Sequence, residues 1–198
     1  LFLKRSMYAD NFIKRRFIFS SRRQSTLCGF VEKDGKSLLL KLNSKLRTQI
    51  RQFSKLKKVN SDIYISLENN VSEKFMLFIL KKYRGQRPNI EKLKILSKQK
   101  MLYIISVQYN NKYQASMIWL KNLNKCRLIY NVLDHKELRV NKIRNCNKYL
   151  MYKSILDLSL EEVKEIDLGG ISGKNNEIDQ FKKAFAQKEK YTYNYIYI

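Results

Sequence analysis

Three strand-like segments follow one another closely in the middle of this chain, and they constrain its fold more than any other feature. The predicted strands are residues 101–109, 113–121 and 125–133. Short asparagine-rich turns join them, at Asn110 and Asn111 and at residues 122–124, and asparagine suits the backbone of tight turns. Strands joined by turns this short pair as antiparallel neighbours. We therefore expect an antiparallel meander at the centre of a sheet.

Helical patterns flank the meander on both sides. Before it, a strand at 61–67 precedes helices at about 72–83 and 89–98, which Gly85 and Pro88 separate. After it come a long helix at about 141–159, a strand at 163–168, a helix at 176–186 and a tyrosine-rich strand at 191–198. The resulting order, β-α-α-β-β-β-α-β-α-β, indicates an α/β fold with a mixed sheet, helices against it and a helical crossover.

The N-terminal part is basic and less regular. Residues 1–36 are expected to be a basic arm or the remnant of a preceding domain, and residues 37–198 the main domain. Segments 26–31 and 37–42 are interpreted as short strands around a turn at Asp34 and Gly35. A helix capped by Asn43 or Ser44 should then point Leu46, Ile50, Phe53 and Leu56 inward. Its outer face is basic, with Lys45, Arg47, Arg51, Lys55, Lys57 and Lys58.

The net charge is +24, with 41 Lys and Arg against 17 Asp and Glu. A field of this sign attracts RNA, nucleotide phosphates and anionic lipid. The excess of lysine over arginine, 29 to 12, is equally typical of an AT-rich coding sequence. Hydrophobic residues make up 44% of the chain, which is enough for a sizeable core.

Metal sites and membrane spans find no support in the sequence. The three cysteines lack the spacing of metal ligands, and His135 is the only histidine, so we expect no metal. No apolar run reaches the roughly 18 residues that a transmembrane helix needs, and no signal peptide is evident. We expect a cytoplasmic location, and the basic helix at 45–58 suits peripheral contact with an anionic membrane.

A double glycine and a later aromatic-cationic pair form the most informative motif. The strand at 163–168 ends in Gly169 and Gly170, and Phe181 and Lys182 follow on the next helix. Two glycines permit positive φ or the close approach of another chain, toward which Lys182 could point a cation. The plain alternative is a strand-to-helix turn with a surface lysine.

Four segments in the same order resemble the GNAT-like FemAB/FemX group of proteins. They are residues 46–51, 147–150, 167–171 and 178–185, and the resemblance covers roughly residues 37–198. It implies a GNAT (acyl-CoA N-acyltransferase)-like fold and transfer of an acyl or aminoacyl group to an amine. The implied donor is aminoacyl-tRNA or acyl-CoA, and the implied acceptor is a cell-envelope precursor of peptidoglycan or surface polysaccharide. The chain resembles the second of two such domains with the tail of the first, or a shortened single-domain relative.

The resemblance also assigns roles to residues. The family's Phe-Lys pair maps onto Phe181 and Lys182, and the lysine would lie near the reacting ester, where a fixed ammonium stabilises a tetrahedral oxyanion. Gly169 and Gly170 would leave room for the donor. Asn147 lies in the matched part of the crossover helix and is a candidate donor-binding residue.

Donor phosphates and the general base are less well defined. Residues 139–145 have no glycine, which weakens binding of acetyl-CoA, although Arg139, Lys142 and Arg144 could grip phosphate. A solvated basic face explains these cations equally well. Asp134 and His135 follow the third meander strand and are candidate bases, as is Tyr130. Asp167 is expected to cap the turn after its own strand.

Two other functions stay open. Interleaved aromatic and basic residues, including the tyrosines of the last strand, would suit a non-catalytic RNA-binding protein. Glu177 and Ala186 stand where the family usually has glycine, which would suit a degenerate pseudo-enzyme.

Overall fold

The structure is a computed structural model that describes residues 2–6, 19–68, 70–83, 85, 88–140, 143–170 and 176–196. It divides the chain into two compact units. The larger unit is Val31–Ile166, and the smaller combines Leu1–Phe30 with Asp167–Ile198. Each unit has its own set of paired strands, and we describe them separately.

The sheet of the larger unit is an antiparallel meander in the order β6-β5-β4-β3. Its strands are β3 (Ile63–Leu67), β4 (Leu102–Tyr109), β5 (Lys112–Asn122) and β6 (Lys125–Leu133). Asn110 and Asn111 join β4 to β5 with φ of 47° and 59°, the two positive values of a type I′ hairpin. The predicted meander is therefore confirmed.

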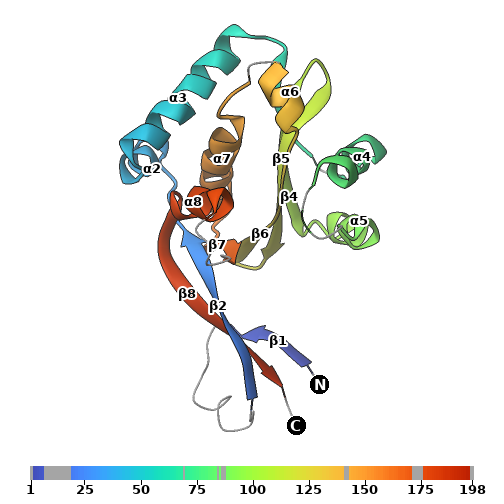
Figure 1. Ribbon diagram of the computed structural model, residues 1–198, viewed down its shortest axis with the longest axis vertical. Helices are drawn as coiled ribbons and strands as arrows, with labels where there is room; N and C mark the ends of the chain where they lie inside the picture. The colour runs from blue at the N-terminus through green and yellow to red at the C-terminus, as the bar shows by residue number, and fades with distance from the viewer. Residues whose placement is uncertain are drawn as a thin grey trace. The chain divides into compact units, whose positions relative to one another are not determined.

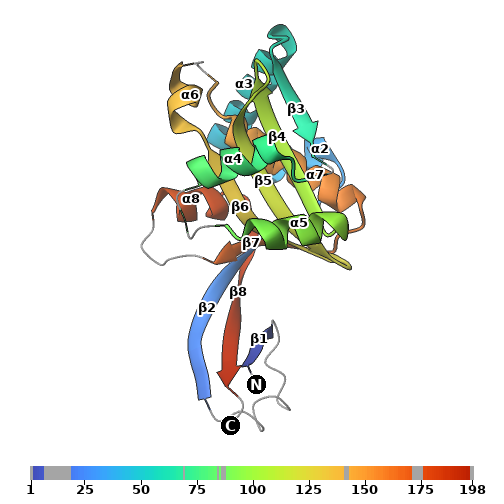
Figure 2. The same cartoon turned by 90° about the vertical axis from the view of Figure 1, so that its right-hand side faces the viewer.

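Helices cover both faces of this sheet (Figures 1 and 2). On one face lie α4 (Glu73–Lys82) and α5 (Ile90–Lys98); on the other, α7 (Cys146–Leu160) packs on β4 and β5, and α3 (Ser44–Val59) packs on α7. The core beneath α4 and α5 consists of Phe75, Phe78, Ile79, Leu93, Ile104, Ile118 and Val132. Burial of these apolar side chains drives the layers together.

The second core lies between α3 and α7. In α3, Leu46, Ile50 and Phe53 are buried at the expected helical spacing, and Asn43 caps the helix by accepting a hydrogen bond from the Leu46 N–H at 2.9 Å. On α7 the buried positions include Leu150, Met151, Ile155 and Leu158. Helix α3 therefore confirms Leu46, Ile50 and Phe53 as inward residues, whereas Leu56 is half-buried. Helix α7 begins at Cys146 rather than near residue 141.

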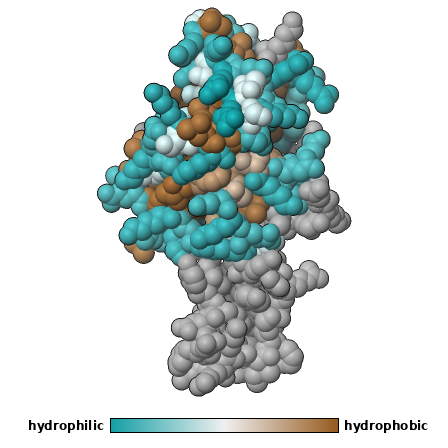
Figure 3. All heavy atoms as spheres, turned by 90° about the vertical axis from the view of Figure 1, so that its left-hand side faces the viewer, coloured by the Kyte–Doolittle hydropathy of each residue, from teal (hydrophilic) through white to brown (hydrophobic). Residues whose placement is uncertain are grey.

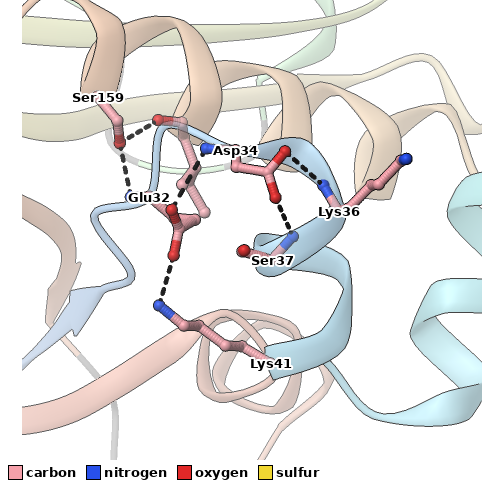
Figure 4. A network of polar contacts seen from close by, with 7 residues as sticks. Glu32, Asp34, Lys36, Ser37, Lys41 and Ser159 are labelled. Atoms are coloured by element: carbon pink, nitrogen blue, oxygen red, sulfur yellow. Dashed lines mark hydrogen bonds and ion pairs between the residues drawn. The ribbon is translucent and has the colours of Figure 1, made fainter.

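The predicted strand at 37–42 is wrong, because these residues lie mostly in helix α2 (Gly35–Lys41). Figure 4 shows the reason. The Asp34 carboxylate accepts hydrogen bonds from the N–H groups of Lys36 (3.3 Å) and Ser37 (2.8 Å), which makes Asp34 an N-cap rather than a turn residue. Glu32 accepts from the Asp34 N–H (3.3 Å) and pairs with Lys41 (2.6 Å), which ties the first turn of α2 to its last.

A second unpredicted helix, α6 (His135–Val140), follows β6 directly. Asp134 accepts a hydrogen bond from the Leu138 N–H with its carbonyl oxygen, at 2.9 Å, and so begins the helix. The sequence does not predict this helix, because six residues give too little helical periodicity to detect.

The smaller unit is a sheet in the order β1-β8-β2-β7, accompanied by helix α8 (Glu177–Lys183). Its strands are β1 (Phe2–Ser6), β2 (Phe19–Gly29), β7 (Glu165–Gly170) and β8 (Ala186–Ile196), of which β7 begins in the larger unit. Strand β2 pairs antiparallel with both β7 and β8, and β2 and β8 form a long ribbon (Figure 1).

Part of the segment expected to be a basic arm therefore contributes strands. The predicted final strand starts earlier than expected, at Ala186. The tyrosine side chains of this strand and residues 7–18 lie outside the described part of the chain. The division into an arm at 1–36 and a domain at 37–198 stays a prediction.

Candidate functional site

The smaller unit brings together the double glycine and the lysine of the predicted motif. The Lys182 ammonium of α8 donates a hydrogen bond to the carbonyl oxygen of Gly170, at 2.8 Å, at the end of β7. Gly169 has a φ of 85°, in the left-handed region where a side chain would be strained. The glycine therefore serves the backbone conformation that the sequence suggested.

Buried polar contacts fix this strand end. Asp167 is buried; its Oδ1 accepts hydrogen bonds from the Gly169 N–H, at 2.7 Å, and from the hydroxyl of Thr26 on β2. Asp167 thus caps the turn at its own strand end, as expected. This leaves Asp167 a positioning role, because its carboxylate holds the backbone that Lys182 contacts.

Helix α8 is anchored by a cap and an aromatic contact. The Asn176 side chain accepts a hydrogen bond from the Asp179 N–H at 2.9 Å. The ring of Phe181 packs against fully buried Phe185, with centroids 5.6 Å apart. Phe181 thus anchors the helix, and the adjacent Lys182 is half-buried.

In the larger unit, Asp134 is engaged in structural contacts. Its Oδ2 lies 2.7 Å from the Lys82 ammonium, and its Oδ1 accepts a hydrogen bond from the Glu137 N–H at 3.3 Å. Burial alone would raise the pKa of this carboxyl, but the hydrogen bond from Lys82 and the contacts to α6 outweigh it, so the pKa of Asp134 lies below its ordinary value. A general base with a lowered pKa is a weak one.

The neighbouring candidates lie on or near α6. His135 is the first residue of this helix and Arg139 is in its last turn, and both side chains are exposed. Tyr130 on β6 is half-buried and packs edge-on against Tyr83, with ring centroids 5.0 Å apart. Among the described contacts, none joins His135 to Asp134 in a catalytic pair.

The start of α7 has features that favour an anion. Asn145 precedes the helix with a left-handed φ of 66°, and its side chain accepts no hydrogen bond from the first N–H groups of α7. The Lys148 ammonium is half-buried and lies 3.1 Å from Asn145 Oδ1. Burial lowers the pKa of Lys148, and the nearby ammonium of Lys45 lowers it further. Anions that bind between such cations relieve their repulsion.

Two of the residues predicted to bind the acyl donor lie at the start of α7. Asn147 is in the first turn of α7, and its Oδ1 is buried without a hydrogen-bond partner in the described part of the chain. Arg144 is exposed just before the helix, and Lys142 lies outside the described residues. Lys148 was missed by the sequence analysis, although a cation in the first turn of a long helix is a detectable anomaly, since the helix dipole disfavours it there.

The structure thus assembles two groups of candidate residues. Lys182, Phe181, Gly169 and Gly170 meet in the smaller unit, whereas Asp134, His135, Arg139, Arg144 and Asn147 belong to the larger. Among the described residues, no cluster of three or more His, Cys, Asp or Glu side chains is arranged to hold a metal ion. None of the described helices is both long enough and apolar enough to cross a membrane.

Comparison with solved structures defines the class of fold. No protein-family model matches this chain, and no curated protein matches its sequence. A tandem GNAT protein from the clavulanic acid biosynthesis pathway aligns with a TM-score of 0.50, 8% identity and 91% of this chain. The chain therefore has a GNAT-like fold, which confirms the predicted α/β class.

More similar folds belong to FemX and L-PGS. FemX aligns with a TM-score of 0.66 at 10% identity over 87% of this chain, and L-PGS from Bacillus licheniformis with 0.58 at 10% over 94%. The chain spans 61% of that FemX chain, 64% of the L-PGS chain and 55% of the tandem GNAT protein. The resemblance to FemX that the sequence suggested is thus matched in the fold.

Proposed function

We propose that this protein is a transferase that moves an acyl or aminoacyl group from a phosphate-bearing donor to an amine. The observation that carries the proposal is the Lys182 ammonium, held 2.8 Å from the Gly170 carbonyl at the glycine-rich end of β7. The likeness in fold to FemX and to a GNAT protein supports the same class of reaction.

The proposed reaction is an aminolysis. The acceptor nitrogen attacks the donor carbonyl carbon, a tetrahedral oxyanion forms, and its collapse expels the donor oxygen or sulfur while the nitrogen loses a proton. Lys182 would stabilise the oxyanion by charge and by hydrogen bonding. Loss of one such donor costs about 3 kcal/mol, or on the order of 100-fold in rate.

The start of α7 supports a donor that carries phosphate. As a separate proposal for the larger unit, Lys148, Lys45 and the first N–H groups of α7 would hold phosphate oxygens, and the buried Asn147 Oδ1 would accept a hydrogen bond from a bound group. The glycine-free segment before α7 favours aminoacyl-tRNA over acyl-CoA. The acceptor is proposed to be an amine of a cell-envelope precursor, and the place of reaction the cytoplasm.

The test compares Lys182→Ala with Lys183→Ala, since both lysines lie on α8 and both changes remove one charge. Label would be followed from a pool of aminoacylated tRNA, and separately from acetyl-CoA, into a cell-envelope precursor fraction. Lys182→Ala should lower kcat roughly 100-fold with little change in donor Kd, while Lys183→Ala keeps most of the activity.

Equal activity of the two variants would remove Lys182 from the reaction. Transfer from acetyl-CoA with none from aminoacyl-tRNA would assign the protein to the CoA-dependent branch. Unmeasurable transfer by the wild type from both donors would favour the pseudo-enzyme alternative that Glu177 and Ala186 suggested.

A second candidate function is non-catalytic RNA binding, which the net charge of +24 favours. Affinity for uncharged tRNA, measured at two salt concentrations, separates the two. Salt-sensitive binding that ignores both the aminoacyl group and Lys182→Ala would support the RNA-binding alternative.

A further inference from the structure

The helices α2 and α3 carry a strongly one-sided charge. Between Asp34 and Asp62 the sequence has no acidic residue, and it has eight lysines and arginines. By contrast α4, α5 and α8 each have glutamate in their first turn. We define the α2–α3 surface as the exposed side chains of Lys36, Leu40, Arg51, Lys55, Lys58 and Val59.

The geometry of α3 gathers three of these cations in one row. Arg51, Lys55 and Lys58 follow at intervals of four and three residues, so they lie on one face of the helix. The opposite face is the buried one that packs on α7. Within the described part of the chain, none of the three cations has a carboxylate partner, so their field is directed at solvent.

Aliphatic side chains accompany the cations. Leu40 near the end of α2 is 74% exposed, and Val59 at the end of α3 is 83% exposed. Figure 3 shows the face of the molecule on which α2 and α3 lie, where hydrophobic patches are set among hydrophilic residues. Exposed aliphatic side chains beside lysines are typical of a surface that contacts lipid. Lysine stems extend along apolar groups while the ammonium stays in water.

We propose that the α2–α3 surface docks on an anionic lipid bilayer. Charge complementarity with acidic headgroups supplies the attraction, and Leu40 and Val59 reach into the interface. RNA fits less well, because the surface has no exposed aromatic side chain on which a base could stack. The surface is independent of Lys182, so the proposal does not depend on the transfer reaction.

The test is co-sedimentation of the full chain with vesicles. Phosphatidylcholine vesicles with 30% phosphatidylglycerol are compared with pure phosphatidylcholine, at low and high salt. The triple variant Arg51→Gln, Lys55→Gln, Lys58→Gln removes the row of cations. The matched control, Lys81→Gln, Lys92→Gln, Lys98→Gln, removes the same charge from exposed positions on α4 and α5.

We expect the wild type to bind anionic vesicles in a salt-sensitive way and to ignore neutral ones. The α3 variant should lose roughly 100-fold in partition coefficient, since each cation contributes about fivefold, whereas the control should lose far less. The double variant Leu40→Ser, Val59→Ser should weaken the part of vesicle binding that remains at high salt.

Three results would overturn the proposal. Equal losses in the two triple variants would mean that net charge alone directs binding. Absence of vesicle binding by a folded wild type would rule out the bilayer. A large loss of affinity for RNA in the α3 variant, with vesicle binding unchanged, would assign the surface to RNA instead.

Discussion

At the scale of the residue, backbone conformation gives a direct prediction about Leu123. This residue turns the chain between β5 and β6 with a φ of 52°, and its side chain is 96% exposed. Left-handed backbone costs a leucine about 1 kcal/mol, and asparagine tolerates it better. Leu123→Asn should therefore raise the free energy of unfolding by roughly 0.5–1 kcal/mol, measured by urea denaturation.

Leu123→Ala is the control for this change. It removes the same exposed side chain but keeps a residue that dislikes positive φ, so it should give no comparable gain. If alanine stabilises as much as asparagine does, the exposed leucine rather than its backbone is the cause.

Single residues also show what sequence can and cannot reveal about the site. Predictions from local sequence are confirmed at two places. Asn110 and Asn111 form the predicted hairpin, and Asp167 caps the turn at the end of its own strand, β7. The ion pair between Lys82 and Asp134 could not be predicted, because these residues are far apart in the sequence and only the packing of α4 against the sheet joins them.

At the scale of the element, short helices were the hardest to predict. Asp34 and Gly35 suit a tight turn as well as they suit a helix start, so the sequence predicts a strand where α2 lies. Contacts with distant residues add to the Asp34 cap: the Tyr152 hydroxyl of α7 donates to the Gly35 carbonyl oxygen at 3.2 Å, and Leu38 is buried. Long helices such as α3 and α7 are predictable from sequence because their apolar periodicity extends over several turns.

The anchoring of α6 leads to a prediction about pH. The pKa of Asp134 is lowered in the folded protein, so between that value and the ordinary 3.8 the unfolded chain binds more protons than the native one. Its contribution is therefore complete above about pH 3.8 and is lost as pH falls through the lowered pKa. Asp134→Asn should cost about 1–3 kcal/mol at pH 7 and progressively less in acid.

Thermal unfolding of the wild type and Asp134→Asn from pH 7 to pH 2.5 measures this effect. Asp62→Asn, which removes an exposed carboxylate of the same unit, is the control and should leave Tm nearly unchanged. A difference between wild type and Asp134→Asn that stays constant down to pH 2.5 would contradict the role of the ionised carboxylate.

At the scale of the whole molecule, the described residues of the two units differ in how much apolar surface they bury. The described core of the smaller unit is limited to Leu27, Cys28, Leu168 and Phe185, while the larger unit has two helix-covered cores. Local stability follows the apolar surface that an element buries. The smaller unit should therefore open more often than the larger.

Three buried cysteines report this difference, with Cys28 in the smaller unit and Cys126 and Cys146 in the larger. Burial raises the pKa of Cys146 to about 12, so a disulfide reagent at pH 8 can reach its thiolate only through opening. In single-cysteine variants made with alanine, Cys28 should react at least tenfold faster than Cys146 at low denaturant, a difference of about 1.4 kcal/mol in opening. Equal rates that track global unfolding would instead show that both units open in one cooperative step, and the candidate residues of β7 and α8 would then be as rigidly held as those of the meander.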